Sequence, residues 1–458
     1  MQSRWEDKGA RVAVERWGQE GGEDLALRVY TSRLIGIDPE LVLHGGGNTS
    51  VKTNARDIFG EPVAALFVKG SGTSLEAVTP RDLPGLDLEY LRRLRALPAL
   101  SDEAMVNELR THLLDASSPN PSVETLLHAF LPHAFVDHSH ADAILALTDQ
   151  PGGTELAREA FGDRVAVLPY IMPGFPLAKA VADAVEHAPD VEGVVLAKHG
   201  LFSFGHDARS SYERHIALVD TAERFLEGRR AGRALLTPRF AAPRRAPKEL
   251  AAMVAPRLRG LLAEPSGDDS NYRRVIARWS ASSDVLEFCA SEQARVLARR
   301  GPITPDHVIR TKSLPMFVSD PVWEDEDALE KQLRDAVASY RLEYDRYFEK
   351  HARNAGSEKT KLDSAPRVVI LPGAGVFCFG RSAGDARIAS DITRHTLRTK
   401  ALAEAVGEYE ALSPAELFAM EYWSLEQAKL RGRTARPLKG QVALITGGAG
   451  AIARGIAT

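Results

Sequence analysis

The stretch Val136-Asp137-His138-Ser139-His140-Ala141 sets two histidines two residues apart between apolar flanks. On a β-strand, alternate side chains project from the same face, so both imidazoles would point toward one spot. A second buried-type run, residues 193–197, is followed closely by His199 and a glycine turn. Three protein ligands with one open position are typical of a catalytic zinc site. This pattern favours a metal site at His138, His140 and His199; the alternative is that these histidines are hydrogen-bonded polar residues of the core.

Charge and composition exclude several classes of protein. The 458 residues carry 58 basic and 62 acidic side chains, and the net charge of −4 gives no overall attraction to nucleic acid or anionic membranes. The two cysteines, Cys289 and Cys378, are far apart, which predicts neither a disulfide framework nor a zinc ribbon. No run reaches the roughly 18 apolar residues of a membrane span, and the first residues lack the apolar core of a signal peptide. We expect a cytoplasmic protein with no nucleic-acid or membrane partner.

Helices and strands alternate along the first half of the chain. Periodicity and capping residues predict helices at 21–36, 102–115, 123–130, 153–161, 177–187 and 208–229. Buried-type strands are expected at 66–68, around His138, at 164–170 and at 193–197. This alternation indicates one sheet covered by helices, in a first domain over residues 20–236. No internal repeat is visible.

A composition rich in Pro, Arg and Ala from residue 238 marks a domain boundary. The region 237–435 reads as an α/β extension without recognisable chemistry. Helices are predicted at 248–263, 324–350, 388–408 and 413–430, and strands at 272–279, 284–288 and 367–377.

Residues 436–458 have a sequence pattern unlike that of the two preceding regions. A buried-type strand at 442–446 enters a glycine turn and then a helix, as at the start of a dinucleotide-binding (Rossmann) unit, with Gly447 and Gly450 as cofactor-binding glycines. A doubly wound domain needs several more strands. We expect an incomplete Rossmann start, disordered or irregularly packed, from a longer fusion that would bind NAD only when intact.

Two turns rich in hydrogen-bond donors occur early in the chain. The first contains Gly47 and Asn48, and the second contains Ser71 and Gly72 beside a lysine. Each is a flexible turn or a nest for an anion, two interpretations of about equal weight. Two such turns in one segment favour a phosphate site.

Ser122 is predicted to cap the helix 123–130, which places Glu124 in its first turn on the same face as His128. A first-turn carboxylate is most often a complement to the helix dipole. Because the helix leads directly into the strand of His138, Glu124 would also lie within reach of the metal.

Five motifs, taken in order, resemble the class II aldolase family of fuculose-phosphate and rhamnulose-phosphate aldolases: Gly47-Asn48-Thr49-Ser50, Lys69-Gly70-Ser71-Gly72, Ser122-Val123-Glu124, His138-Ser139-His140 and Lys198-His199-Gly200. The whole layout resembles bifunctional rhamnulose-1-phosphate aldolase/short-chain dehydrogenase fusions. The resemblance implies an α/β/α sandwich with a mainly antiparallel sheet, and homo-oligomers, possibly tetramers, with active sites between subunits. It also implies Zn²⁺ on the three histidines, acid/base work for Glu124, and phosphate binding by Gly47, Asn48, Ser71, Gly72 and Ser122.

Two departures from the family pattern stand out. The family commonly has Ser-Ser-Glu where this chain has Ser122-Val123-Glu124, and Ala451 and Ala453 stand where the dehydrogenase pattern has glycines. The expected function is zinc-dependent retro-aldol cleavage of a ketose 1-phosphate, L-rhamnulose 1-phosphate, to dihydroxyacetone phosphate and L-lactaldehyde. The alternatives are a fuculose-phosphate aldolase, a sugar-phosphate 4-epimerase, a non-catalytic sugar-phosphate binder, and an NAD-dependent lactaldehyde dehydrogenase activity in a C-terminal part beyond this sequence.

Overall fold

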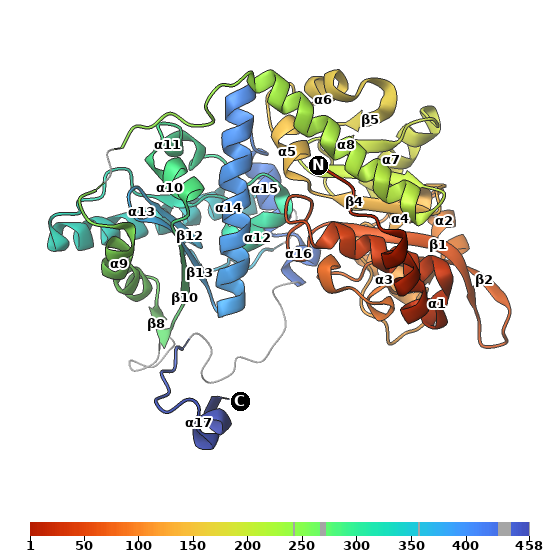
Figure 1. The fold of residues 1–458 in the computed structure, drawn as a ribbon, viewed down its shortest axis with the longest axis horizontal. Helices are drawn as coiled ribbons and strands as arrows, with labels where there is room; N and C mark the ends of the chain where they lie inside the picture. The colour runs from red at the N-terminus through yellow and green to blue at the C-terminus, as the bar shows by residue number, and fades with distance from the viewer. Residues whose placement is uncertain (241–242, 266–271, 356–357, 429–440, 458) are drawn as a thin grey trace.

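Two β-sheets lie on either side of a layer of helices in the computed structural model (Figure 1). The structure describes residues 1–240, 243–265, 272–355, 358–428 and 441–457. The first sheet belongs to the N-terminal half of the chain and the second sheet to the C-terminal half.

The first sheet has seven strands in the order β3-β2-β1-β4-β7-β6-β5. They are β1 (Asn48–Arg56), β2 (Pro62–Val68), β3 (Gly85–Asp87), β4 (Phe135–Ser139), β5 (Val165–Leu168), β6 (Gly193–Leu196) and β7 (Gly200–Gly205). Only β5 and β6 pair in parallel among these strands. The predicted, mainly antiparallel α/β sheet is confirmed.

Helices cover both faces of this sheet. The first face packs against α2 (Leu88–Leu94), α3 (Asp102–Thr111), α4 (Thr125–Phe130) and α7 (Phe175–His187). The second face packs against α1 (Asp7–Gly36), α5 (Asp142–Thr148), α6 (Gly153–Phe161) and α8 (Ala208–Arg230). The predicted helix 21–36 is the second half of α1, which is kinked at Gly21 and Gly22.

Strand β4 lies at the centre of this sandwich and is buried along its whole length. His138 stacks on Phe202 of the neighbouring strand, with ring centroids 3.9 Å apart. Asp137, one residue earlier, points to the opposite face, where it forms a fully buried ion pair with Arg28 of α1 and accepts a hydrogen bond from Ser211 of α8. The alternation of the strand therefore separates the histidine from a buried structural ion pair.

The second sheet has four strands in the order β10-β13-β12-β11. They are β10 (Ile276–Ser280), β11 (Met316–Phe317), β12 (Val368–Leu371) and β13 (Gly375–Gly380). Helices α9 (Pro247–Leu261) and α13 (Glu326–Ala352) cover one face, and α10 (Ser283–Ala290) and α14 (Ala383–Val406) cover the other. A separate ribbon pairs β8 (Glu264–Pro265) with β9 (Tyr272–Arg273).

The strand predicted at 284–288 is wrong, because these residues lie in α10. Val285, Phe288 and Cys289 are the buried residues of that helix. Their spacing of three and four residues directs all three side chains into one core, which a strand of alternating faces would not do. Short apolar runs are ambiguous between helix and strand when the sequence alone is considered.

The second sheet repeats the last four strands of the first. The strand order β4-β7-β6-β5 is matched by β10-β13-β12-β11, and only the last pair in each is parallel. In each hairpin a leucine pairs with a glycine across a three-residue turn, Leu196 with Gly200 and Leu371 with Gly375. Helices α8 and α14 each begin eight residues after that glycine. The expectation of no internal repeat was wrong.

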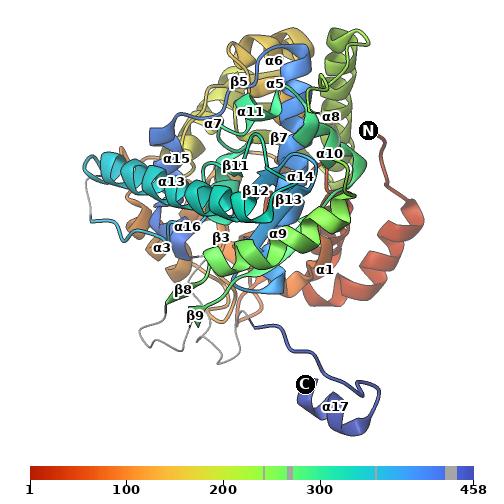
Figure 2. The ribbon, with the colours of Figure 1, turned by 90° about the vertical axis from the view of Figure 1, so that its left-hand side faces the viewer.

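The two halves share one apolar core. Helices α5 and α8 from the first half meet α10 and α14 from the second, and buried side chains of all four belong to a single cluster (Figures 1 and 2). The remaining helices are α11 (Ala294–Leu297), α12 (Val308–Thr311), α15 (Pro414–Glu421), α16 (Ser424–Ala428) and α17 (Ala451–Ala457). Within the described ranges, no helix combines the length and apolarity that crossing a membrane requires.

The strand predicted at 442–446 does not form, because no neighbouring strand among the described residues lies beside it to complete a ladder. The predicted helix does form, as α17, and it lies apart from both sheets (Figure 1). Gly447 sits in the turn before this helix with φ of +70°. A nucleotide-binding role for Gly447 and Gly450 stays a prediction.

Candidate metal and substrate site

Three histidines from separate parts of the chain converge. His138 lies in β4, His140 directly follows that strand, and His199 lies in the turn between β6 and β7. The Nε2 atoms of His138 and His140 are 3.0 Å apart. One candidate ligand atom from each of the three histidines lies within 4.8 Å of the others. The structure thus brings together the three residues that the sequence predicts as ligands.

The environment of His138 suits a metal ligand. Its Nδ1 lies 3.0 Å from the carbonyl oxygen of Leu201, an acceptor, so Nδ1 carries the proton and Nε2 presents a lone pair. Burial, followed by the proximity of His140 and His199, lowers the pKa of His138 well below its usual value. A neutral imidazole is the form that binds a metal ion. Three buried imidazole nitrogens are a donor set that fits Zn²⁺ or a similar divalent cation.

Glycines allow the backbone to approach this group closely. A side chain at Gly200 would collide with the carbonyl oxygen of Ser139. Gly47 adopts a φ of +60°, and a Cβ atom there would lie 2.6 Å from the carbonyl oxygen of His138. Both positions therefore require glycine for β1, β4 and β7 to pack as they do.

Glu124 faces the histidines. Its Oε2 lies 3.5 Å from Nε2 of His138, and its Oε1 lies 3.5 Å from Nε2 of His199. The Nδ2 group of Asn48 donates a hydrogen bond of 2.6 Å to Oε2, which holds the carboxylate in place. The side chain makes no capping bond to its own helix. The carboxylate therefore points toward the histidines and does not cap the start of its helix.

One local prediction around Glu124 was wrong. Helix α4 begins at Thr125 with Glu124 as its N-cap, whereas the sequence pattern predicted Ser122. The Oγ of Ser122 instead accepts a hydrogen bond of 3.3 Å from the backbone N–H of Glu124, which fixes the turn before the helix. His128 lies on the same side as Glu124, because the side chain of Asn48 bonds to both. It is buried and bonds to Ser50 and Asn48 in a structural network.

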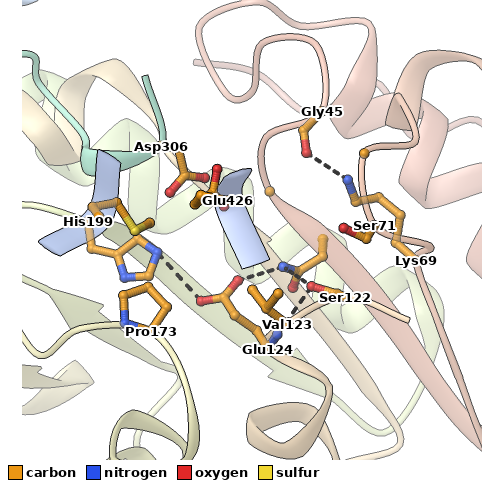
Figure 3. Close-up of a pocket in the computed structure, with 14 residues that line it drawn as sticks. Gly45, Lys69, Ser71, Ser122, Val123, Glu124, Pro173, His199, Asp306 and Glu426 are labelled. Atoms are coloured by element: carbon orange, nitrogen blue, oxygen red, sulfur yellow. Dashed lines mark hydrogen bonds and ion pairs between the residues drawn. The ribbon is translucent and has the colours of Figure 1, made fainter. Parts of the chain in front are cut away.

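The two donor-rich turns lie side by side at this site. Nζ of Lys69 donates hydrogen bonds of 2.8 Å to the carbonyl oxygens of Gly45 and Thr73 and so ties the turns together. A pocket extends from these turns to His199. Its lining includes Gly47, Asn48, Ser71, Gly72 and Ser122 together with Glu124 and His199. The predicted phosphate and acid/base residues thus share one pocket (Figure 3).

The sequence reasoning missed three further residues of the pocket, all from the C-terminal half: Asp306, Met420 and Glu426. Asp306 lies in a short 3₁₀ turn, Pro305–His307, and its Oδ2 is 3.6 Å from Nδ1 of His140. No local pattern marks these residues, because they reach the site only through the packing of the two halves.

Comparisons with known proteins match most of the chain to two family domains. Residues 27–226 match the class II aldolase and adducin N-terminal domain, and residues 249–430 match the second domain of class II aldolase. The uncharacterized oxidoreductase YuxG of Bacillus subtilis (strain 168) is 34% identical over 444 residues, which cover 94% of this chain and 62% of that protein. The chain therefore spans less than two thirds of the length of this relative.

Two solved structures are also similar. The N-terminal class II aldolase domain of a conserved protein from Thermoplasma acidophilum is 43% identical, covering 49% of this chain and 99% of that one, with a TM-score of 0.43. L-fuculose-1-phosphate aldolase from Thermus thermophilus is 21% identical, covering 46% of this chain and 99% of that one, with a TM-score of 0.30. On the matches to both family domains, the chain belongs to the class II aldolase family.

Proposed function

We propose that the protein cleaves a ketose 1-phosphate, L-rhamnulose 1-phosphate, by a metal-dependent retro-aldol reaction to dihydroxyacetone phosphate and L-lactaldehyde. The observation that carries the proposal is the convergence of three buried imidazoles with Glu124, at a pocket that His199 and the two donor-rich turns also line. Membership of the class II aldolase family supports aldolase-type chemistry on a sugar phosphate.

The metal site would be formed by His138, His140 and His199, whose neutral nitrogens fit Zn²⁺. When bound, the cation supplies Lewis-acid stabilisation of the negative charge that develops on the substrate oxygens. His138 is oriented by the carbonyl oxygen of Leu201 and by stacking on Phe202.

Glu124 is the proposed acid/base group. Breaking the carbon–carbon bond releases the hydroxyl proton of the carbon that becomes the aldehyde, whose C=O bond forms. The electron pair of the broken bond stays on the carbon that becomes part of dihydroxyacetone phosphate, and this carbon must receive a proton. Glu124 is buried beside two of the imidazoles and is held by Asn48, a placement that suits general acid catalysis. In the reverse direction the same carboxylate would remove that proton.

The turns containing Ser71 and Ser122 would bind the phosphate group. Hydroxyls and backbone N–H groups of tight turns are donors to anions. Holding the phosphate fixes the position of the reacting carbons relative to Glu124 and lowers the entropic cost of alignment.

The test is release of dihydroxyacetone phosphate from L-rhamnulose 1-phosphate by protein loaded with Zn²⁺, stripped of metal by a chelator, and reloaded. We expect activity in the first and third samples and loss of activity in the second. Full activity of the stripped protein, verified to be metal-free by elemental analysis, would refute the proposal.

Parallel assays separate the alternative substrates. Faster cleavage of L-fuculose 1-phosphate would reassign the substrate but keep the reaction. Conversion of ribulose 5-phosphate to its C4 epimer without release of a triose phosphate would instead identify a 4-epimerase. Binding of these sugar phosphates without turnover of any would indicate a non-catalytic binder.

A further inference from the structure

The C-terminal half closes one side of the reaction pocket. Asp306 and Glu426 face the pocket from the side opposite Glu124, as Figure 3 shows, while Ser71 and Lys69 lie toward its other end. Glu426 is 1% exposed, and Met420 beside it is equally buried. These side chains thus belong to the interior of the site, although they come from sequence more than 160 residues after Glu124.

Specific contacts hold these residues over the pocket. Met420 and Trp423 form an apolar cluster with Val308, against which Val123 of the first half packs. The indole N–H of Trp423 also donates a hydrogen bond of 2.5 Å to Asp102 at the start of α3. Helices α15 and α16 are therefore fixed to the first half directly beside Glu124.

The pocket continues past Asp306 and Glu426 into a second space. This second space shares both carboxylates with the first pocket and is bordered by His140. Its lining combines polar side chains, among them His44 and Arg310, with the apolar side chains of Pro39, Val42, Leu43, Ile309, Ile388 and Ile392. A substrate whose phosphate lies at the turns and whose reacting carbons lie at the histidines would extend its remaining carbons in this direction.

The two carboxylates and the apolar side chains beyond them fit a particular kind of substrate group. A carboxylate accepts hydrogen bonds at up to four positions, so each of the two can bind a hydroxyl donor in addition to its protein contacts. Burying carboxylates is costly unless donors surround them. The apolar side chains beyond them favour an alkyl end. The combination fits an aldehyde fragment with a hydroxyl next to the carbonyl carbon and a short alkyl tail.

We propose that Asp306 and Glu426 bind this hydroxyl and so make the C-terminal half the specificity-determining part of the active site. This inference rests on the proposed aldolase function. It assigns the second domain a role in choosing the aldehyde, while the first domain carries out the chemistry.

The test uses the reverse reaction, in which dihydroxyacetone phosphate is joined to an aldehyde by the zinc-loaded protein. L-lactaldehyde is compared with propanal, which lacks only the hydroxyl. We expect the wild-type protein to prefer L-lactaldehyde by about tenfold to a hundredfold in kcat/KM, because a hydrogen bond to a charged acceptor is stronger than one between neutral groups. In Asp306→Asn and Glu426→Gln, the ratio of kcat/KM for L-lactaldehyde to kcat/KM for propanal should fall about tenfold.

Asp320→Asn is the matched control, because Asp320 is an exposed carboxylate of the same half, away from the pocket. Its preference should equal that of the wild type. The ratio of kcat/KM for the two aldehydes is insensitive to partial misfolding or lower metal content, because both substrates are affected equally. If Glu426→Gln does not fold, Asp306→Asn still tests the inference, since Asp306 lies in a turn near the surface. Products from both aldehydes with an unchanged ratio in the Asp306 variant would overturn this inference alone. No product from either aldehyde with wild-type protein would overturn the proposed function itself.

Discussion

The two sheets share a strand pattern but differ in the residues that it presents. Ser139 of β4 pairs with Leu201, and Ser280 of β10 pairs with Val376, at equal distances from the turn glycines Gly200 and Gly375. This register matches the three histidines of the first sheet to three residues of the second. The pairs are His138 with Trp279, His140 with Ala281, and His199 with Ala374.

In the second sheet the matched positions form a structural contact and not a group of metal-type donors. The indole N–H of Trp279 donates a hydrogen bond of 2.7 Å to the carbonyl oxygen of Ala374. The side chain at the position of the first histidine thus bonds to the backbone at the position of the third. The same backbone arrangement supports a metal-type donor set in one half and a purely structural contact in the other, so the chemistry belongs to the side chains and not to the fold.

The largest expected effect comes from His199→Ala, which makes the first hairpin resemble the second. The two remaining imidazoles form an incomplete donor set, and Lewis-acid stabilisation is worth several kcal/mol. We expect metal content to fall to background and cleavage of the ketose phosphate to fall about 10³-fold or more. Elemental analysis and a coupled assay for dihydroxyacetone phosphate measure the two effects.

Ala374→His is the reciprocal control. It adds one imidazole where Trp279 and Ala281 supply no companion ligand, so we expect no gain in metal content. Retention of metal and full rate in His199→Ala would show that the two hairpins differ for another reason.

The next largest effect is expected from Glu124→Gln, which removes the proposed acid/base group of the first half. Among the described residues, the second sheet repeats β4 to β7 but has no counterpart of β1, the strand whose Asn48 holds Glu124. The amide keeps the shape of the side chain but does not transfer a proton. We expect unchanged metal content and a kcat lower by about 10² to 10⁴. A kcat close to wild type would remove Glu124 from the proposed proton transfer.

The pH dependence of stability should also distinguish the halves. His215, the eighth residue of α8, is fully buried between Ser139 and Ser203, whereas the eighth residue of α14 is Ser390. Burial lowers the pKa of His215 to about 4. The unfolded chain, with an ordinary histidine pKa of about 6.5, therefore binds the proton first as the pH falls.

This histidine thus stabilises the fold above pH 6.5 and loses its contribution between about pH 6.5 and pH 4. The loss approaches about 3 kcal/mol at the lower limit. Urea unfolding at pH 7 and pH 4.5 should show a steeper decline for wild type than for His215→Gln. Equal declines would mean that the proton uptake resides elsewhere.

The smallest expected effects come from the two turn glycines. An added Cβ would meet the carbonyl oxygen of Ser139 at Gly200 and that of Ser280 at Gly375. Each alanine variant should lose about 1–3 kcal/mol of unfolding free energy through overpacking. Only Gly200→Ala should also weaken metal binding, because the new methyl would lie 3.2 Å from ring atoms of both His138 and His140. Equal metal affinity in both variants would contradict this difference.

Much of the first half could be predicted from local pattern. Alternation placed His138 and His140 toward one point, and the apolar run before His199 correctly indicated a strand and turn. The helices 153–161 and 208–229 correspond closely to α6 and α8, since their apolar faces have helical spacing.

The repeat was visible in the sequence but overlooked. Both hairpins carry the same spacing of glycine and phenylalanine, in Gly200-Leu201-Phe202-Ser203-Phe204-Gly205 and Gly375-Val376-Phe377-Cys378-Phe379-Gly380. The turns of the two hairpins differ in chemistry, so the shared framework shows in this spacing and not in the reactive side chains.

The sequence by itself determined which donor groups this protein possesses and which of them share a strand or a turn, because side-chain direction follows from local spacing. Only the tertiary structure decided that Asp306 and Glu426 join Glu124 and the histidines in one pocket. That meeting depends on the core shared by α5, α8, α10 and α14 and on the packing of Met420 and Trp423, contacts between segments hundreds of residues apart. Such contacts arise from the shape and burial of whole surfaces, which no short stretch of sequence encodes.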